Sequence, residues 1–119
     1  MKTLVVAGGL FVLMGSCKKD TISSPNACTA ANPLEEVAWL KQTKESLVCT
    51  DLYQYLIVKA IYRNQPVFYV NFSCPSCNYV FRATLLDCEG RAVRTFTSTE
   101  MQSFDKEVIN RQVMYTCKP

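Results

Sequence analysis

The segment LYQYLIVKAIYRNQPVFYVNFS, residues 52–73, decides the fold of this chain. Aromatic and β-branched residues dominate it, and such residues favour strands. Arg63-Asn64-Gln65 interrupts the run, and asparagine tolerates the positive φ that a tight turn requires. The segment therefore predicts two strands, residues 52–62 and 66–73, and a link this short allows only an antiparallel pair.

Two more strands are predicted further along the chain, at residues 78–86 and 91–97. Glu89-Gly90 lies between them and has the acidic–glycine pattern of a hairpin turn. Residues 111–117 form either a fifth strand or an extended tail. Because every link is short, the sequence predicts an antiparallel meander of four to five strands.

A helix is predicted before the sheet, over residues 33–47, and it begins at Asn32-Pro33-Leu34-Glu35. Asn32 can cap it, proline suits the first helical position, and Glu35 can reach back to the cap. Trp39 lies at the margin of the buried stripe of this helix. We interpret Trp39 as core or edge cover, with stacking on a ligand as the alternative.

A second, shorter helix is predicted near the C-terminus, from Thr99 with Gln102 as its capping partner to about residue 109. The order of elements gives an α+β fold, in which the N-terminal helix is packed on the antiparallel sheet and the short helix follows the strands. A single small domain, residues 32–119, accounts for all of them.

The N-terminal residues predict export. Lys2 precedes an apolar run over residues 4–14 that is too short to span a bilayer. The sequence then continues as Met14-Gly15-Ser16-Cys17, which resembles the lipobox of bacterial lipoproteins, with methionine where leucine is usual. The resemblance implies a signal peptide over residues 1–16, cleavage before Cys17, and a lipid such as palmitate on the Cys17 sulfur. Residues 17–31 are then the lipidated end and a flexible tether; an ordinary secretion signal with an unrelated cysteine is the alternative.

Charge and composition disfavour several classes of function. The chain has 13 basic and 10 acidic residues and no basic block, so nucleic acid is not an expected partner. It has no histidine, so neither a Ser-His-Asp triad nor a Cys-His pair can be built from it. We therefore expect no enzymatic activity, no cofactor and no metal site.

Six cysteines follow Cys17, and an even number in an exported chain predicts a disulfide-stapled domain. If each strand reverses direction, the cysteine after the third strand lies beside the start of the first helix, which pairs Cys28 with Cys88. The remaining four lie at the opposite end of the sheet. There Cys49 and Cys117 are predicted to pair with Cys74 and Cys77, in either arrangement.

Cys74-Pro75-Ser76-Cys77 is the motif with the most chemical potential. A redox CxxC motif works because a helix N-terminus lowers the pKa of its first thiol. Here the motif lies between two predicted strands, which favours a structural role in disulfides. Thiol–disulfide exchange and a zinc site are the alternatives, and the lack of histidine disfavours zinc.

Aromatic residues are dense between residues 53 and 81. Packing within the sheet is their ordinary role. The alternative is a tyrosine-rich sheet face that binds a protein or a glycan, because tyrosine joins apolar area to a polar tip. Its candidate members are Tyr53, Tyr55, Tyr69 and Tyr79.

Three stretches carry a family resemblance: NPLEEVAWLK at residues 32–41, IYRNQPVFYV at 61–70 and LLDCEGR at 85–91. Together they resemble a family of small lipid-anchored lipoproteins of Gram-negative bacteria, which combine an NPLE…WL helix, an aromatic hairpin and a DC-[DE]-G turn. In this chain Asn64 stands where glycine is usual in the hairpin. The resemblance implies a bacterial cell-envelope location at the outer membrane, either periplasmic or surface-exposed, and it brings no activity with it.

The sequence as a whole predicts a non-enzymatic, lipid-anchored envelope domain that binds another component. Its expected partners are the membrane, through the N-terminal lipid, and an envelope protein or glycan. The alternative function is that of a thiol–disulfide protein that uses Cys74 and Cys77.

Overall fold

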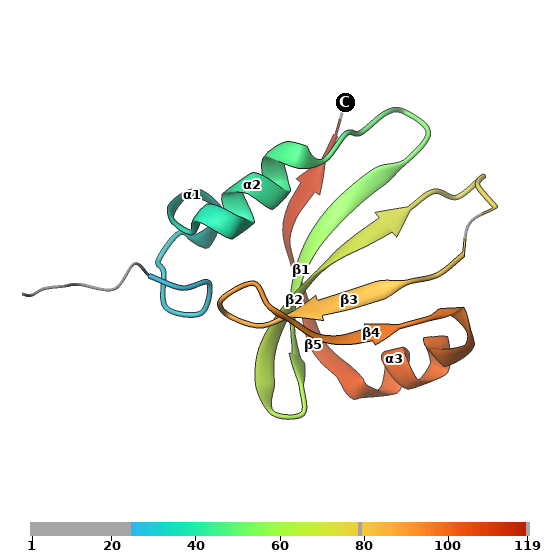
Figure 1. The fold of residues 1–119 in the computed structure, drawn as a ribbon. Helices are drawn as coiled ribbons and strands as arrows, with labels where there is room; N and C mark the ends of the chain where they lie inside the picture. Colours follow the sequence, from blue (N-terminus) through green and yellow to red (C-terminus); the bar gives the residue numbers. More distant parts are fainter. Residues whose placement is uncertain (1–24, 79, 119) are drawn as a thin grey trace, which may run out of the picture.

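The computed structural model of the protein describes residues 25–78 and 80–118. The predicted signal peptide, Cys17 and Tyr79 lie outside these residues. The helices are α1 (Pro33–Glu36), α2 (Ala38–Ser46), the 3₁₀ helix η2 (Ser98–Glu100) and α3 (Met101–Glu107). The strands are β1 (Gln54–Tyr62), β2 (Gln65–Ser73), β3 (Ala83–Leu86), β4 (Ala92–Phe96) and β5 (Val108–Cys117), as Figure 1 shows. In this part of the chain, no helix has the length and apolar character needed to cross a membrane.

The five strands form one antiparallel sheet in the order β4-β3-β2-β1-β5. Strands β1 to β4 lie next to one another in sequence order, which confirms the predicted meander. β1 and β2 pair along their whole length. The turn between them places Arg63 at φ 50° and Asn64 at φ 63°, which confirms the predicted hairpin. Two successive residues at positive φ suit a tight hairpin, because they match the twist of the strands. Residues 108–117 form a true strand, antiparallel to β1, rather than a tail.

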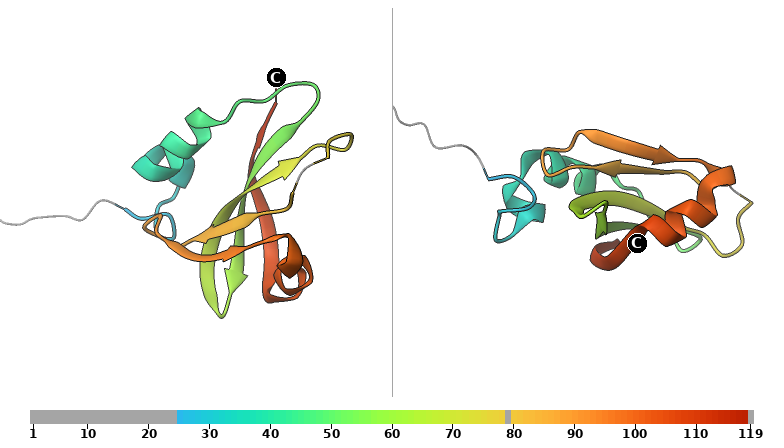
Figure 2. Two further views of the ribbon diagram at one scale, coloured as in Figure 1. Left: turned by 45° about the vertical axis from the view of Figure 1, so that its right-hand side comes forward. Right: turned by 90° about the horizontal axis from the view of Figure 1, so that it is seen from below.

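The third strand is shorter than predicted, because it begins at Ala83 rather than at residue 78. β3 pairs with β2 only where Leu86 lies opposite Phe68. Figures 1 and 2 show the two strands spreading apart from there toward the connection of residues 74–82. A turn in that connection, in which the Cys77 N–H donates to the Cys74 carbonyl at 3.2 Å, takes the chain out of the ladder.

The predicted N-terminal helix is divided into α1 and α2 at Val37, which is buried and has an extended backbone. The predicted side-chain cap is also wrong, since Asn32 accepts hydrogen bonds only through its carbonyl, one of them from the Glu35 N–H. The Glu35 carboxylate instead pairs with Lys44 at 2.8 Å. The hydrogen bond from Lys44 holds the pKa of Glu35 below its usual value.

The C-terminal helix has a different cap from the predicted one. Thr97 and Glu100, not Thr99 and Gln102, form a capping box, in which the Thr97 N–H donates to Glu100 Oε1 at 3.0 Å. This box caps η2, the 3₁₀ turn that leads directly into α3, whereas α3 itself has no side-chain cap. Both pairs fit the same sequence pattern, but a charged carboxylate accepts a stronger hydrogen bond than an amide does. α3 ends at Glu107 because β5 begins at the next residue.

Buried side chains form two clusters, to which residues on opposite faces of β1 contribute. The larger cluster includes α3 through Phe104, and the smaller one includes α2 through Leu40. Figures 1 and 2 place α1 and α2 at one end of the molecule and α3 at the other. The larger cluster consists of Val58, Ala60, Tyr62, Val67, Tyr69, Ala83, Leu85, Phe96, Phe104 and Val108; the smaller one consists of Ala27, Val37, Leu40, Ile57 and Phe68.

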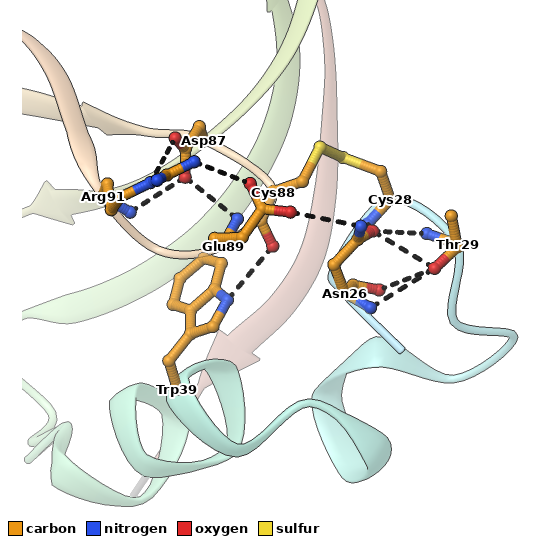
Figure 3. The surroundings of a disulfide bond; sticks show 8 residues. All are labelled: Asn26, Cys28, Thr29, Trp39, Asp87, Cys88, Glu89 and Arg91. Carbon is orange, nitrogen blue, oxygen red and sulfur yellow. Dashed lines mark hydrogen bonds and ion pairs between the residues drawn. A yellow bond between two sulfur atoms is a disulfide. The ribbon is translucent and has the colours of Figure 1, made fainter. Parts of the chain in front are cut away.

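Residues 26–31, which the sequence assigned to the tether, contact the domain. Ala27 is only 2% exposed, and its N–H donates to the Cys88 carbonyl at 3.0 Å. Cys28 forms the predicted disulfide with Cys88, and the Trp39 indole N–H donates to the same carbonyl at 3.3 Å (Figure 3). Trp39 also meets Phe68 edge-to-face at 5.8 Å, as expected for an edge-covering residue.

The other two disulfides join Cys49 to Cys117 and Cys74 to Cys77. The prediction that Cys49 and Cys117 would each pair with Cys74 or Cys77 is therefore wrong. β5 adds to the free side of β1, where Cys117 lies opposite Tyr55 and near the α2–β1 connection that carries Cys49. β2 lies on the other side of β1. The two cysteines after β2 are therefore left to pair with each other.

Candidate functional site

The end of the sheet where β2 leads toward β3 gathers exposed apolar side chains. Val48, Leu52 and Val80 are 67%, 70% and 77% exposed, more than any other large apolar side chain in residues 25–78 and 80–118. Leu52 lies just before β1 and Val80 lies in the β2–β3 connection, at the end of the sheet where Gln54 of β1 pairs with Ser73 of β2. Val48 lies apart from them, two residues after the end of α2. Large apolar groups gathered in one place mark an interaction surface, whereas scattered ones need no explanation.

Three partly exposed aromatic rings lie beside these side chains. Tyr55 and Phe72 face each other across β1 and β2, with ring centroids 5.2 Å apart. Tyr53 is 5.9 Å from Tyr55 and 5.4 Å from Phe72. These mutual contacts hold the three rings in place. We call the surface of Leu52, Tyr53, Tyr55, Phe72 and Val80 the aromatic end.

Two open pockets of about 270 and 220 Å³ lie at the aromatic end. Pockets for small-molecule ligands usually exceed about 300 Å³, so these two fit single side chains of a partner better than a cofactor. Polar groups line both pockets together with apolar ones. The larger is lined by Tyr55, Asn71, Phe72, Val80, Phe81 and Arg82, and the smaller by Asp51, Leu52, Tyr53, Gln54, Ser73 and Pro75.

A pocket of about 480 Å³ lies elsewhere, between the β1–β2 turn and the β3–β4 turn. Its carboxylates, Asp87 and Glu89, already pair with Arg91 at 3.1 and 3.2 Å. Hydrogen bonds from the backbone N–H groups of Arg91 and Glu89 hold the pKa of Asp87 below its usual value. These groups are committed to the β3–β4 turn, which makes this pocket the weaker candidate.

The structure divides the predicted tyrosine face. Tyr53 and Tyr55 lie at the aromatic end, but Tyr69 is only 4% exposed and packs edge-to-face on Phe104 at 5.3 Å. The prediction for Tyr69 is therefore wrong, because side chains alternate along a strand and Tyr69 stands opposite Val58 on the other face. Burial also raises the pKa of Tyr69 above its ordinary value.

The sequence missed Leu52 and Val80 as surface residues, because it placed both inside predicted strands. Both lie outside the strands, and no residue pattern marks the point at which the ladder stops. Leu52 and Val80 are exposed because the strands end before they reach these residues.

The Cys74–Cys77 disulfide lies at the same end of the sheet. Cys74 is buried at the end of β2, whereas Cys77 is exposed. The described residues after Cys77 lead to β3 and not to a helix, as the sequence predicts. Among the described residues, the helix N-terminus that activates a redox CxxC motif is therefore not present after Cys77.

Comparisons of the chain with protein-family models, curated proteins and solved structures found no match. Within residues 25–78 and 80–118, histidine, cysteine, aspartate and glutamate side chains form no group of three that could hold a metal ion. Among the described residues, the exposed apolar surface and the disulfide with its exposed Cys77 are thus the features from which we infer function.

Proposed function

We propose that this protein is a non-enzymatic, lipid-anchored domain of the bacterial outer membrane that binds a protein partner through its aromatic end. The proposal rests on the strong exposure of Leu52 and Val80, which line the two pockets beside the rings of Tyr53, Tyr55 and Phe72. Covering Leu52 and Val80 is worth about 3 kcal/mol, because full burial of one such side chain is worth about 1.5–3 kcal/mol and roughly three quarters of each is still exposed.

A protein is a better partner for this surface than a glycan. Exposed aliphatic side chains have no polar complement on a sugar, whereas the core of a protein interface is apolar. Tyr53 and Tyr55 add aromatic area with a polar tip, which is enriched in protein interfaces. The two small pockets suit side chains that project from the partner.

The position of the lipid directs the aromatic end away from the membrane. Cys17 precedes Pro25, the first described residue, by eight positions, and eight residues of extended chain reach at most about 28 Å. The side of the domain that carries the Cys28–Cys88 disulfide is thus held near the membrane. The β2–β3 connection lies at the far side of the molecule from α1 (Figures 1 and 2), which leaves the aromatic end open to a partner.

We also infer that α2 packs on the sheet, as the sequence predicts. Leu40 belongs to the same buried cluster as Ile57 and Phe68, and the Trp39 ring contacts Phe68. This contact links the anchored side of the domain rigidly to the strands that carry the aromatic end.

Photo-crosslinking in the native envelope tests the binding proposal. A photoreactive residue in place of Leu52 is expected to capture one discrete protein, and Val80→Asp in the same chain is expected to abolish the capture. The matched control is a photoreactive residue in place of Val93, which is 49% exposed on β4. Equal capture from position 93, or adducts that contain glycan instead of protein, would contradict the proposal.

The anchor has a separate test. Cys17→Ser is expected to move the protein from the membrane fraction to the soluble fraction and to abolish labelling by fatty acid. The circular dichroism spectrum should not change, because Cys17 precedes the described domain. Retention of the unlabelled variant in the membrane fraction would contradict lipid as the anchor.

A further inference from the structure

We propose that the Cys74–Cys77 disulfide is a thiol–disulfide exchange site, at which an incoming dithiol attacks the sulfur of Cys77. This inference is independent of the binding function proposed above. It rests on how the two sulfurs differ in access and on how little of the fold depends on their bond.

Access distinguishes Cys77 from every other described cysteine. Cys77 is exposed, as are Pro75 and Ser76 before it, whereas Cys74 is only 6% exposed. Each of the four cysteines in the other two disulfides is buried or half-buried. A thiolate must reach a disulfide sulfur directly in order to exchange, so the exposed position of Cys77 favours attack at its sulfur over attack at the buried and half-buried cysteines.

Opening this disulfide is a local event. Both cysteines lie outside the strands, because β2 ends at Ser73 and β3 begins at Ala83. The Cys49–Cys117 disulfide, in contrast, joins the α2–β1 connection to β5 across 68 positions. The Cys28–Cys88 disulfide spans 60 positions, beside the hydrogen bonds from Ala27 and Trp39.

The exchange balances as a two-electron, two-proton transfer. A thiolate of the dithiol reductant forms a bond with Cys77 Sγ, the Cys74–Cys77 bond breaks, and Cys74 leaves as a thiolate that takes a proton from solvent. The second thiol of the reductant then attacks the reductant sulfur of this mixed disulfide, and Cys77 leaves as a thiolate. The reductant ends as a disulfide, and the protein ends with two thiols.

The local turn also makes the step reversible. The Cα atoms of Cys74 and Cys77 are 5.2 Å apart, and the hydrogen bond from the Cys77 N–H to the Cys74 carbonyl spans the same four residues. Two thiols that such a turn keeps adjacent close again within one chain, which is favoured over pairing with a distant thiol. A disulfide-containing oxidant therefore restores the original pair.

Graded reduction of the purified full-length protein tests the proposal. The protein is incubated with increasing dithiothreitol without denaturant, quenched with iodoacetamide, and mapped by mass spectrometry. We expect Cys74 and Cys77 to be alkylated at a concentration at least about tenfold lower than that needed for the other four cysteines. Opening of another disulfide first, or of all three together, would overturn the inference. So would re-pairing of Cys74 or Cys77 with Cys49 or Cys117 after oxidised glutathione is added.

Two single variants identify the attacked sulfur. Cys74→Ser leaves Cys77 as a free thiol, and Cys77→Ser leaves Cys74 as a free thiol. The two variants differ only in which of these two cysteines remains. The Cys77 thiol is expected to react with an aromatic disulfide reagent at least about tenfold faster, because reaction rate follows access. Equal rates, or a faster Cys74 thiol, in variants with native circular dichroism would overturn the assignment.

Discussion

Gly90→Ala should destabilise the protein strongly, although Gly90 lies in a turn at the surface. Gly90 has φ +86°, and a Cβ atom added there would lie 2.7 Å from Cδ2 and 2.8 Å from Cγ of Trp39. These atoms belong to the base of a rigid ring, so the indole must move as a whole.

The expected cost is the sum of three contributions. An alanine in the left-handed region costs about 1 kcal/mol. Displacing Trp39 breaks the hydrogen bond from its indole N–H to the Cys88 carbonyl, worth about 1 kcal/mol, and its edge contact with Phe68, worth about 1 kcal/mol. We therefore expect the free energy of unfolding to fall by about 3 kcal/mol, a large share of the roughly 5–15 kcal/mol typical of a domain.

Urea unfolding with the disulfides intact measures this loss, and Trp39 provides the signal because it is the only tryptophan in the chain. Its emission in the folded variant should shift to longer wavelength as the indole becomes exposed. The same substitution in a Trp39→Leu background completes a double-mutant cycle. Leucine can yield to the new Cβ, so the cost of Gly90→Ala should fall there to about 1 kcal/mol, the backbone contribution.

Two results would refute this reasoning. One is a loss below about 1 kcal/mol in the native background, which would show that the ring and the turn adjust freely. The other is an equal cost with and without the indole, which would show that the loss does not pass through Trp39.

Three further substitutions test the Cys49–Cys117 disulfide, the Cys74–Cys77 disulfide and the Asp87 carboxylate. Replacing Cys49 and Cys117 together by serine should lower the free energy of unfolding by about 4 kcal/mol, and replacing Cys74 and Cys77 by only about 2 kcal/mol. The reason is that a disulfide removes more entropy from the unfolded chain when the loop that it closes is longer. Equal losses in urea unfolding would contradict this order. Asp87→Asn should destabilise the protein near pH 7, because the pKa of Asp87 is lower in the folded state than its ordinary value, so the ionised form favours folding. This contribution is lost as the pH falls through the folded pKa, and the stabilities of variant and native protein should converge once the pH lies below it. A difference that does not change with pH would contradict the role of the charge.

Most of the sheet could be predicted from the sequence. Residues 52–73 specify two strands and their turn, because aromatic and β-branched side chains alternate on both sides of Asn64, which tolerates positive φ. Helix boundaries and caps were less predictable. Thr97 and Thr99 begin overlapping patterns of the same kind, and only the folded structure shows that Glu100 supplies the stronger acceptor.

The candidate site was only partly predictable. Tyr53 and Tyr55 were selected for their residue type, and that criterion also selected Tyr69, which is buried. Leu52 and Val80 were missed, because exposure at the end of a strand depends on where its neighbour stops pairing. Sequence alone carries no signal for that point.

The sequence by itself determined the antiparallel meander, the helix before it and the Cys28–Cys88 disulfide, because short links and residue preferences are local properties of the chain. The tertiary structure alone decided that β5 adds beside β1, because either free edge of the four-stranded meander offers the same backbone hydrogen bonds. That choice carries Cys117 to Cys49 and leaves Cys74 to pair with Cys77. The exposed disulfide and the aromatic end beside it are consequences of long-range packing.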